Sequence, residues 1–237
     1  MAKKTKMTQT STFADRAINF NKSLELKLNS DLVGVMNPFK NPETLELTEI
    51  FYRKYFDDNN PRHFLFGINP GRFGAGITGI SFTDPINLEK ECGIVNNFGK
   101  KAELSSQFIY KVISSFGGPQ KFFSGFFITA VSPLGFTQNG INLNYYDSKD
   151  LMNEVRPFIV RSIQDQLDFG AHREICICIG GNKNYDFLKK LNKECHFFDE
   201  IVPLEHPRFI MQYRRKSVDQ YVNKYLDALN KCKQTSL

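Results

Sequence analysis

Two short segments hold side chains of the types that take part in hydrolysis. The first is Gly67-Ile68-Asn69-Pro70-Gly71, in which Pro70 keeps Asn69 out of the helical region and Gly71 allows another molecule to approach the backbone closely. The second is Glu205-His206-Pro207, which offers a hydrogen-bond donor. Each segment also has a simpler explanation, because Asn-Pro-Gly commonly forms a turn and a histidine after a strand is more often structural.

The pair of segments is more informative than either one alone. Asn69 follows the first predicted strand and His206 follows the last, so in a parallel sheet both would lie at the carboxyl edge, where ligands bind. There Asn69 would orient a water molecule, and His206 would donate a hydrogen bond to a developing anion. The glycine-rich loop at 67–79 matches neither GxxxxGK[ST] nor GxGxxG, so a nucleotide cofactor has no support and no cofactor is expected.

Alternating helical and extended patterns predict the elements that position these residues. Strands are expected at 63–68, 126–131, 174–179 and near 201–202, and helices at 42–57, 104–116, 148–167, around 185–191 and at 218–229. Pro157 is expected to kink or divide the third helix. Apolar strands separated by helices predict an α/β fold, a three-layer sandwich with a central, mainly parallel four-stranded sheet flanked by helices. We expect one domain over 1–237, in which 1–12 form a flexible basic tail.

Composition narrows the class of protein. The 237 residues have 31 basic and 25 acidic side chains, a formal charge of +6 and 41% hydrophobic residues, which excludes wholesale disorder, collagen-like repeats and coiled coil. There is neither an apolar run long enough for a membrane span nor a secretory signal pattern, so we expect a cytoplasmic monomer, nucleoid-associated if bacterial, with no membrane partner. Five scattered cysteines favour a reduced compartment, and their spacing indicates no metal site.

The motifs resemble those of the single-strand-selective monofunctional uracil-DNA glycosylases, within the uracil-DNA glycosylase superfamily. The similarity covers roughly 33–226 and is carried by GINPGRFGAGITGISF at 67–82, Val131-Ser132-Pro133-Leu134, Gly180-Gly181-Asn182 and His206-Pro207. The first string is specific because it is long, whereas a His-Pro step alone would identify nothing. The resemblance implies base excision repair, in which the N-glycosidic bond of a deaminated base flipped out of DNA is hydrolysed without metal, cofactor or lyase step.

The resemblance also implies roles for individual residues. Asn69 would position the attacking water at the sugar C1′, and His206 would donate a hydrogen bond to O2 of the departing base. Phe82 would stack on the flipped base. Backbone amides near Ile68 and Phe73 would help to read the edge of the base.

Two departures predict a permissive pocket. Gly71 replaces the bulky side chain that stricter uracil-only relatives place over C5, and Ala130 stands where the family usually has an asparagine that reads the pyrimidine edge. Because Ala130 cannot hydrogen-bond a base, discrimination should weaken, and we expect hypoxanthine and xanthine to be excised in addition to uracil. Asn96 or Asn97 would be a substitute amide, although both also fit the simpler role of turn residues in a loop.

The segment after His206-Pro207 is both basic and apolar. The usual Ser-Pro-rich loop of the family is replaced by Arg208-Phe209-Ile210-Met211-Gln212-Tyr213-Arg214-Arg215. Its arginines, Arg208, Arg214 and Arg215, would hold phosphates, while the apolar side chains wedge into the gap left by a flipped nucleotide. The alternative is that Phe209, Ile210 and Met211 pack beneath the loop as core.

Two other classes of protein stay open at this point. A catalytically silent DNA-binding damage sensor of the same fold needs the pocket but not a water-positioning amide, so Asn69 together with His206 favours the enzyme. A hydrolase of free nucleosides is disfavoured by the basic segment. The expected partner is therefore DNA, single-stranded or double-stranded, that contains deaminated bases.

Overall fold

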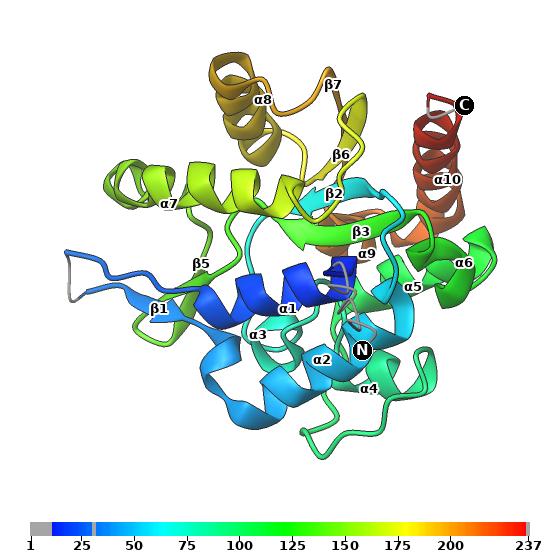
Figure 1. Cartoon of the computed structure of the whole chain (residues 1–237), viewed down its shortest axis with the longest axis horizontal. Coiled ribbons are helices and arrows are strands. Elements are labelled where there is room, and N and C mark those ends of the chain that lie inside the picture. Colours follow the sequence, from blue (N-terminus) through cyan, green and yellow to red (C-terminus); the bar gives the residue numbers. More distant parts are fainter. Residues whose placement is uncertain (1–10, 30–31, 236–237) are drawn as a thin grey trace, which may run out of the picture.

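A four-stranded parallel sheet lies at the centre of the molecule (Figure 1). The computed structural model describes residues 11–29 and 32–235. The sheet has the order β3-β2-β6-β7, with every neighbouring pair parallel. Its strands are β2 (His63–Gly67), β3 (Phe126–Ala130), β6 (Ile175–Ile179) and β7 (Glu200–Leu204). All four predicted strands and their parallel arrangement are confirmed, so the strands end at one common edge.

Helices and a second group of strands surround this sheet. The helices are α1 (Phe13–Ser23), η1 (Pro38–Lys40), α2 (Pro42–Phe56), α3 (Ala75–Thr78), α4 (Pro85–Lys90), α5 (Leu104–Phe116), α6 (Pro119–Phe123), α7 (Lys149–Leu167), α8 (Lys183–Cys195), α9 (Pro207–Tyr213), η2 (Arg215–Ser217) and α10 (Val218–Gln234). The other strands are β1 (Gly34–Met36), β4 (Gly135–Gln138) and β5 (Ile141–Leu143). None of the described helices is long and apolar enough to cross a membrane.

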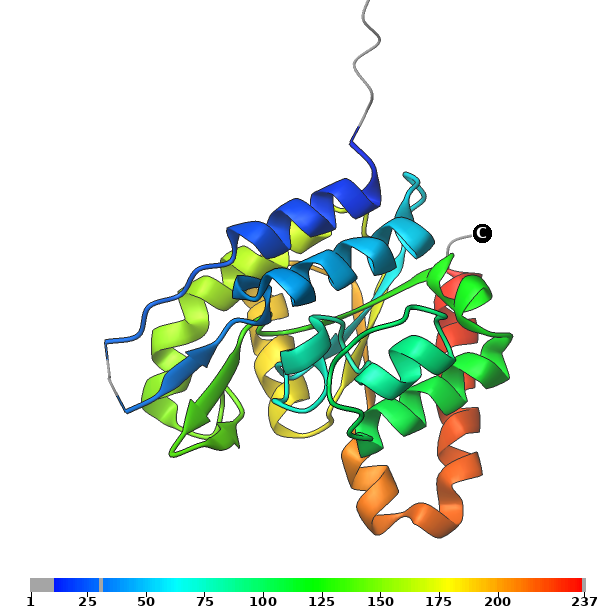
Figure 2. The ribbon, with the colours of Figure 1, turned by 90° about the horizontal axis from the view of Figure 1, so that it is seen from below.

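Helices cover both faces of the sheet (Figure 2), and aromatic side chains pack between the layers. On one face, the ring of Phe127 in β3 packs against Phe13 of α1 at 5.0 Å between centroids. On the other, the neighbouring Phe126 packs against Phe122 of α6 at 5.3 Å. Successive side chains of a strand point to opposite faces, so Phe126 and Phe127 pack against helices on opposite sides of the sheet. The predicted three-layer sandwich is confirmed.

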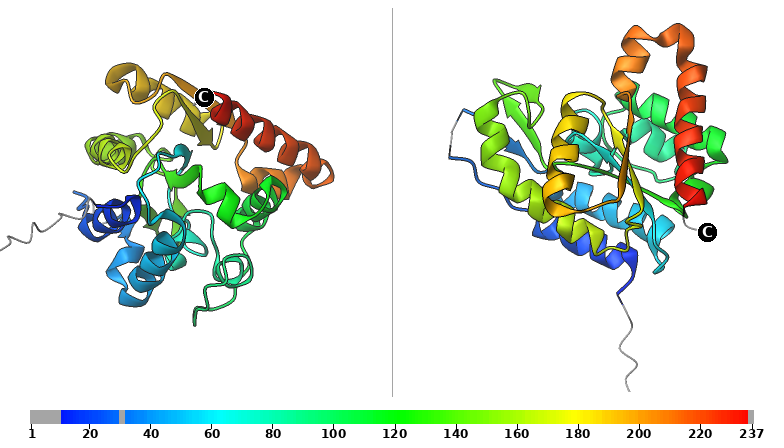
Figure 3. Two further views of the ribbon diagram at one scale, coloured as in Figure 1. Left: turned by 45° about the vertical axis from the view of Figure 1, so that its right-hand side comes forward. Right: turned by 90° about the horizontal axis from the view of Figure 1, so that it is seen from above.

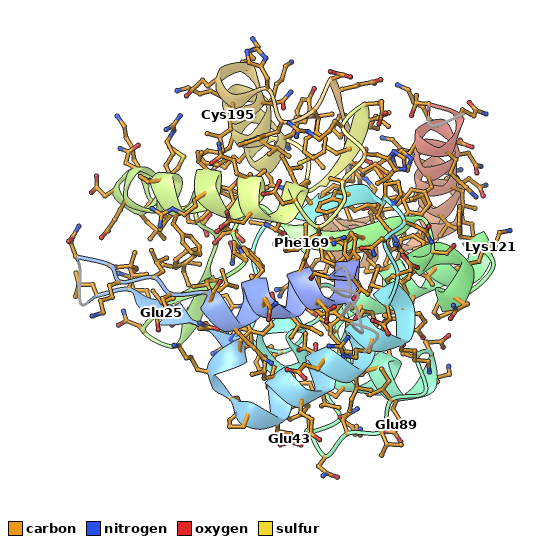
Figure 4. The ribbon with its side chains drawn as sticks, viewed as in Figure 1. Glu25, Glu43, Glu89, Lys121, Phe169 and Cys195 are labelled. Carbon is orange, nitrogen blue, oxygen red and sulfur yellow. The ribbon has the colours of Figure 1, made fainter. Side chains whose placement is uncertain are left out.

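Apolar side chains lie between the layers, and most charged side chains lie on the surface. In Figure 4, Phe169 lies well inside the molecule, whereas Glu25, Glu43, Glu89 and Lys121 lie toward its margin. The Phe169 side chain is 3% exposed and contacts the rings of α1. Burial of aromatic rings in such clusters supplies much of the folding free energy of a domain.

Strands β1, β4 and β5 form a three-stranded antiparallel sheet that was not predicted. Strands of three or four residues are too short to show a clear alternation of apolar and polar residues. Phe136 of β4 pairs with Leu143 of β5, and Gly34 of β1 pairs with Thr137 of β4. This small sheet places β5 next to the loop that carries Asn69.

Position 12, expected to belong to a flexible tail over 1–12, is held in place by hydrogen bonds. Residues 1–10 lie outside the described residues, but Thr12 is the N-cap of α1. Its hydroxyl accepts a hydrogen bond from the Asp15 backbone N–H at 3.2 Å, and the Asp15 carboxylate accepts one from the Thr12 N–H at 2.9 Å. This reciprocal capping box fixes position 12, so the prediction of a tail over 1–12 is wrong there.

Helix α7 runs without interruption through Pro157. Val155, Ile159 and Ile163 are each 0% exposed, so one apolar stripe continues on both sides of the proline. Burial of this stripe offsets the backbone hydrogen bond that proline removes. The alternative that Pro157 divides the helix is wrong.

Candidate active site

A cavity of about 280 Å³ lies at the carboxyl edge of the parallel sheet. Its lining residues come from the segment after β2, the end of β3, strand β5, the start of α5 and the start of α9. They include Gly67, Ile68, Asn69, Gly71, Ser81, Phe82, Glu103, Ser105, Ala130, Asn142, Asn144, His206 and Arg208. Small-molecule sites begin at about 300 Å³, so this volume suits one heterocyclic base. The structure thus brings the asparagine loop and the histidine loop to one site.

The side chain of Asn69 is held by backbone groups next to and within β5. Its Nδ2 donates to the Leu143 carbonyl at 3.1 Å, and its Oδ1 accepts from the Tyr145 N–H at 3.1 Å. A carbonyl only accepts and a backbone N–H only donates, so these two partners fix which end of the amide is oxygen. An amide oxygen has a second lone pair, and this atom can therefore accept a hydrogen bond from a water molecule in the cavity.

The imidazole of His206 is oriented by its own helix. His206 is the N-cap of α9, and its Nδ1 accepts a hydrogen bond from the Arg208 backbone N–H at 3.2 Å. Burial, with a smaller contribution from the nearby Arg208 charge, lowers the pKa of His206 from 6.5 to about 4. The ring is therefore neutral at pH 7, and because Nδ1 accepts, the proton lies on Nε2. His206 is thus a fixed neutral donor at the site.

Phe82 lies beside the histidine in a strained backbone conformation. Its φ is +53°, a region that bulky residues rarely adopt, and its ring centroid is 5.7 Å from that of His206. The ring also comes so close to Gly67 that a Cβ there would lie 2.7 Å from Cε2 of Phe82. Strain of this kind persists where the surroundings hold it, and it commonly marks a functional site. Phe82 lines the cavity, and its stacking on a flipped base stays a prediction.

Gly71 and Ala130 leave space in the cavity. A Cβ on Gly71 would lie 3.4 Å from Nδ2 of Asn142 and 3.6 Å from Oε1 of Glu103, so a methyl group fits there but a bulky side chain would enter the cavity. Ala130 is 6% exposed and presents only a methyl group to the lining. Both residues therefore enlarge the cavity, and neither offers a side-chain hydrogen bond to a ligand.

Three residues proposed to read the base lie elsewhere. Asn96 is buried outside the cavity, where its Nδ2 donates to the Pro85 carbonyl at 2.9 Å and its Oδ1 accepts from Lys100. Asn97 is exposed and also outside the lining, so neither asparagine is the substitute amide, and the simpler loop role holds. Phe73 is 38% exposed on the surface beneath the Lys101 ammonium, and it too lies outside the lining.

The predicted wedge loop is a helix, α9, followed by η2. Figure 3 shows α9 and the start of α10 projecting from the rest of the molecule. Ile210 is 0% exposed, so its assignment as a DNA contact is wrong and the core alternative holds for it. Phe209 is 40% exposed on the same helix, and Met211 is half-buried. Successive positions on a helix lie about 100° apart, so Ile210 faces the core while its neighbour Phe209 faces solvent.

Phe209 is the best placed apolar side chain for contact with DNA. Its ring centroid lies 5.6 Å from that of Tyr213 in a tilted arrangement, and the Arg214 guanidinium lies 5.5 Å from the Phe209 ring. Arg208, Arg214 and Arg215 are exposed. This combination of an aromatic ring and cations on one surface suits a stacked base next to phosphates. The arginines predicted to hold phosphates are thus accessible from solvent.

Substitutions on α9 should separate DNA contact from packing. Phe209→Ala should lower excision from duplex DNA more than from single strands and leave the free energy of unfolding nearly unchanged, because the ring is exposed. Ile210→Ala should lower the free energy of unfolding by about 2–5 kcal/mol, because it removes a fully buried side chain. Single-turnover excision on both substrates and urea unfolding of each variant measure these effects. Equal losses on both substrates for Phe209→Ala would contradict a wedge.

Four residues of the site were not found from the sequence. The Tyr145 hydroxyl donates to Oδ1 of Asn184 at 2.7 Å, and Nδ2 of Asn184 donates to the Ile179 carbonyl at 3.2 Å. These bonds join the segment after β5 to the end of β6, and so they help to fix Tyr145, whose backbone N–H donates to Asn69. Glu103 and Asn142 contribute polar atoms to the lining itself. In the sequence these residues lie far from the two motifs, and only the nearby Gly180-Gly181-Asn182 match pointed towards Asn184.

Comparison with known proteins identifies the family. The family model described as the uracil DNA glycosylase superfamily matches residues 53–230. The crystal structure of wild-type SMUG2 from Pedobacter heparinus is similar to this chain, with 45% sequence identity and a TM-score of 0.91, over 94% of this chain and 99% of that one. A search of curated proteins finds no match. The chain belongs to the uracil-DNA glycosylase superfamily and is a DNA glycosylase, a hydrolase of N-glycosyl bonds.

Proposed function

We propose that the protein excises several deaminated bases from DNA, namely uracil, hypoxanthine and xanthine. The observation that carries the proposal is the cavity with Asn69 and His206 in its lining and with Gly71 and Ala130 where bulk and a base-reading amide would stand. The two polar side chains supply the reaction, and the two small ones remove features that would restrict the base to uracil. No metal or cofactor enters the mechanism.

The reaction breaks the bond between C1′ of the sugar and a base nitrogen, and the bond electrons leave with the base. Such cleavage passes through an oxocarbenium-like sugar, so stabilising the departing anion is the main task. The Nε2–H of His206 donates to O2 of a pyrimidine, or to the corresponding acceptor of a purine, as negative charge gathers there. The water held by Oδ1 of Asn69 then adds to C1′ and loses a proton to solvent, and the departed base anion gains a proton from solvent, which completes hydrolysis.

Asn69 does not need to be a strong base in this sequence of events. Its amide is neutral, but an oxocarbenium ion reacts with a water molecule that is merely well placed. The bonds to Leu143 and Tyr145 keep the amide from rotating, so the water site stays in position. This is why two backbone contacts matter for the chemistry.

DNA is held along α9 while a base is flipped into the cavity. Flipping costs a few kcal/mol and is easiest in single strands and at mismatches. Arg208, Arg214 and Arg215 neutralise phosphates, and Phe209 fills the space that the base leaves. Arg208 also lines the cavity, so the phosphate-binding side of α9 continues into the base site.

The excision spectrum tests this proposal. Oligonucleotides with a single uracil, hypoxanthine or xanthine should all yield an abasic site, which hot alkali converts into a strand break. We expect rate constants for the two purines within a few orders of magnitude of that for uracil, because the cavity lacks the bulk that would exclude them. Activity confined to uracil would refute the broad substrate range.

The same assay addresses the alternatives drawn from the sequence. A silent sensor would bind the damaged strand without producing alkali-labile sites, and a nucleoside hydrolase would act on free deoxyuridine or deoxyinosine alone. The fixed orientation of the Asn69 amide favours hydrolysis over sensing, since a sensor has no use for a water site. The exposed arginines of α9 favour the polymer over free nucleosides.

A further inference from the structure

One carboxyl group lines the base cavity and takes no part in the mechanism above. Glu103 is the N-cap residue of α5, and its backbone N–H donates to Oδ2 of the fully buried Asp84 at 2.8 Å. Asp84 also caps α4 by accepting from the Asn87 N–H at 2.8 Å. The backbone at Glu103 is therefore fixed, and its side chain lines the cavity between α5 and the glycine-rich loop.

Gly74 makes room for the carboxyl group. A Cβ on Gly74 would overlap Oε2 of Glu103 outright, so only glycine permits the side chain to lie there. Within the described part of the chain, no group donates a hydrogen bond to either oxygen of this carboxyl. A carboxyl in that position retains its full capacity to bond a ligand in the cavity.

Asn142 faces the same space from β5. Its Nδ2 and Oε1 of Glu103 lie 3.4 Å and 3.6 Å from the point where a Cβ on Gly71 would stand. Oδ1 of Asn142 is buried and has no hydrogen-bond partner among residues 11–29 and 32–235. Two polar side chains with unused capacity thus flank the space that Gly71 leaves open, and unsatisfied buried groups of this kind call for a partner.

We propose that Glu103, with Asn142 beside it, reads the hydrogen-bonding edge of the flipped base in place of the side-chain amide that Ala130 lacks. The ligand class is a base whose edge has a ring N–H next to a carbonyl, which uracil, hypoxanthine and xanthine share. A protonated carboxyl matches that edge with two hydrogen bonds, since its O–H donates to the carbonyl and its C=O accepts from the N–H. This inference rests on the proposed function, because it takes the cavity as the base site.

The protonation of Glu103 fits this role near neutral pH. Burial, with a further contribution from the negative charge of Asp84, raises the pKa of Glu103 from 4.5 to about 7, while the Arg208 charge acts in the opposite direction. His206 also lines the cavity, but its pKa of about 4 keeps it neutral throughout this range. Above pH 7 the carboxylate loses its donor and repels a carbonyl oxygen. Recognition of the base should therefore weaken as pH rises through about 7.

The test measures binding rather than chemistry. The probe is a single-stranded oligonucleotide with one uncleavable 2′-fluoro-2′-deoxyuridine, and fluorescence anisotropy gives its Kd at pH 6 and pH 8. Each Kd is taken relative to that of an oligonucleotide of the same sequence in which the base is N3-methylated and so lacks the ring N–H. For the wild-type protein, the preference for the uracil probe should fall about tenfold, since the protonated fraction of a group with a pKa of about 7 falls about that much.

Four variants separate reading of the base from a structural role. Glu103→Gln keeps one donor and one acceptor, so its preference should be independent of pH and close to that of the wild type at pH 6. Glu103→Ala should lose the preference about tenfold or more at both pH values, and Gly74→Ala, which displaces the carboxyl without removing it, should do the same. Glu91→Gln, at a half-buried glutamate outside the cavity, is the matched control and should behave as the wild type.

Two results would overturn this role for Glu103. One is a wild-type preference that does not change with pH, and the other is a pH dependence that persists in Glu103→Gln. Failure of the proposed function has a different signature. In that case the binding pattern would hold, but excision assays would show no abasic sites with any deaminated base.

Discussion

Replacing Asn69 with alanine should lower the single-turnover rate constant for uracil excision by about 10²-fold or more. The substitution removes the oxygen that places water against C1′, and misplacing a reacting group by about 1 Å has an effect of that size. It also leaves the Tyr145 N–H and the Leu143 carbonyl without their partner, so the free energy of unfolding should fall by about 1–3 kcal/mol. Quenched excision time courses and urea unfolding of the same preparation measure the two effects separately.

Asn97→Ala is the matched control for this prediction. Asn97 is also an asparagine in a loop, but it is exposed and outside the cavity. Its replacement should change neither the excision rate constant nor the free energy of unfolding. An Asn69→Ala variant that keeps more than a third of the wild-type rate constant would show that water reaches the sugar without this amide. The hydrolytic role assigned to Asn69 would then be wrong.

His206→Asn should lower the same rate constant by about 10²–10³-fold, the usual effect of losing one donor to a developing anion. Asparagine is a good N-cap, so its side chain can still accept from the Arg208 N–H and α9 should stay in place. What is lost is the donor at Nε2, on the far side of the ring. The measured loss therefore reports on the leaving base rather than on the helix.

The pH dependence distinguishes a neutral from a charged histidine. Because the folded-state pKa of His206 is about 4, the wild-type rate should show no titration of this residue between pH 5 and pH 8. The folded state binds fewer protons at this site than the unfolded state, whose pKa is 6.5, so the stability that His206 contributes is lost as pH falls from about 6.5 towards about 4. His206→Asn should remove that part of the acid sensitivity. A chemical-shift titration of His206 with a midpoint near 6.5 would contradict the neutral donor.

The parallel sheet and the two reactive side chains were predictable for a common reason. Each depends on strong local signals, namely long apolar strands at 63–68 and 174–179 and turn residues at Asn69-Pro70 and His206-Pro207. Once the strands are parallel, their carboxyl ends meet at one edge, and the convergence of Asn69 and His206 follows without detailed packing. Topology alone therefore located the centre of the site.

The rest of the lining depends on contacts between distant segments, which local patterns do not encode. Asn96 was a candidate substitute amide as well as a candidate turn residue, and its hydrogen bonds to Pro85 and Lys100 depend on how the loop at 91–103 folds back on α4. The sequence left Ile210 open between a DNA contact and a core residue, and its position on α9 turns it inwards. Glu103 is an ordinary acidic residue in the sequence, and only the contact with Gly74 shows that it lines the cavity.

The hold on Asn69 is made by main-chain atoms of residues 143 and 145, and this affects how the protein can change over evolution. Side chains along β4 and β5 can drift without loosening the amide, because every residue type offers the same carbonyl and, proline apart, the same N–H. An inserted or deleted residue is different. Shifting the pairing of Phe136 with Leu143 by one position would point side chains to the opposite face and carry the carbonyl away from Asn69. The hairpin is thus tolerant of substitution and intolerant of changes in length.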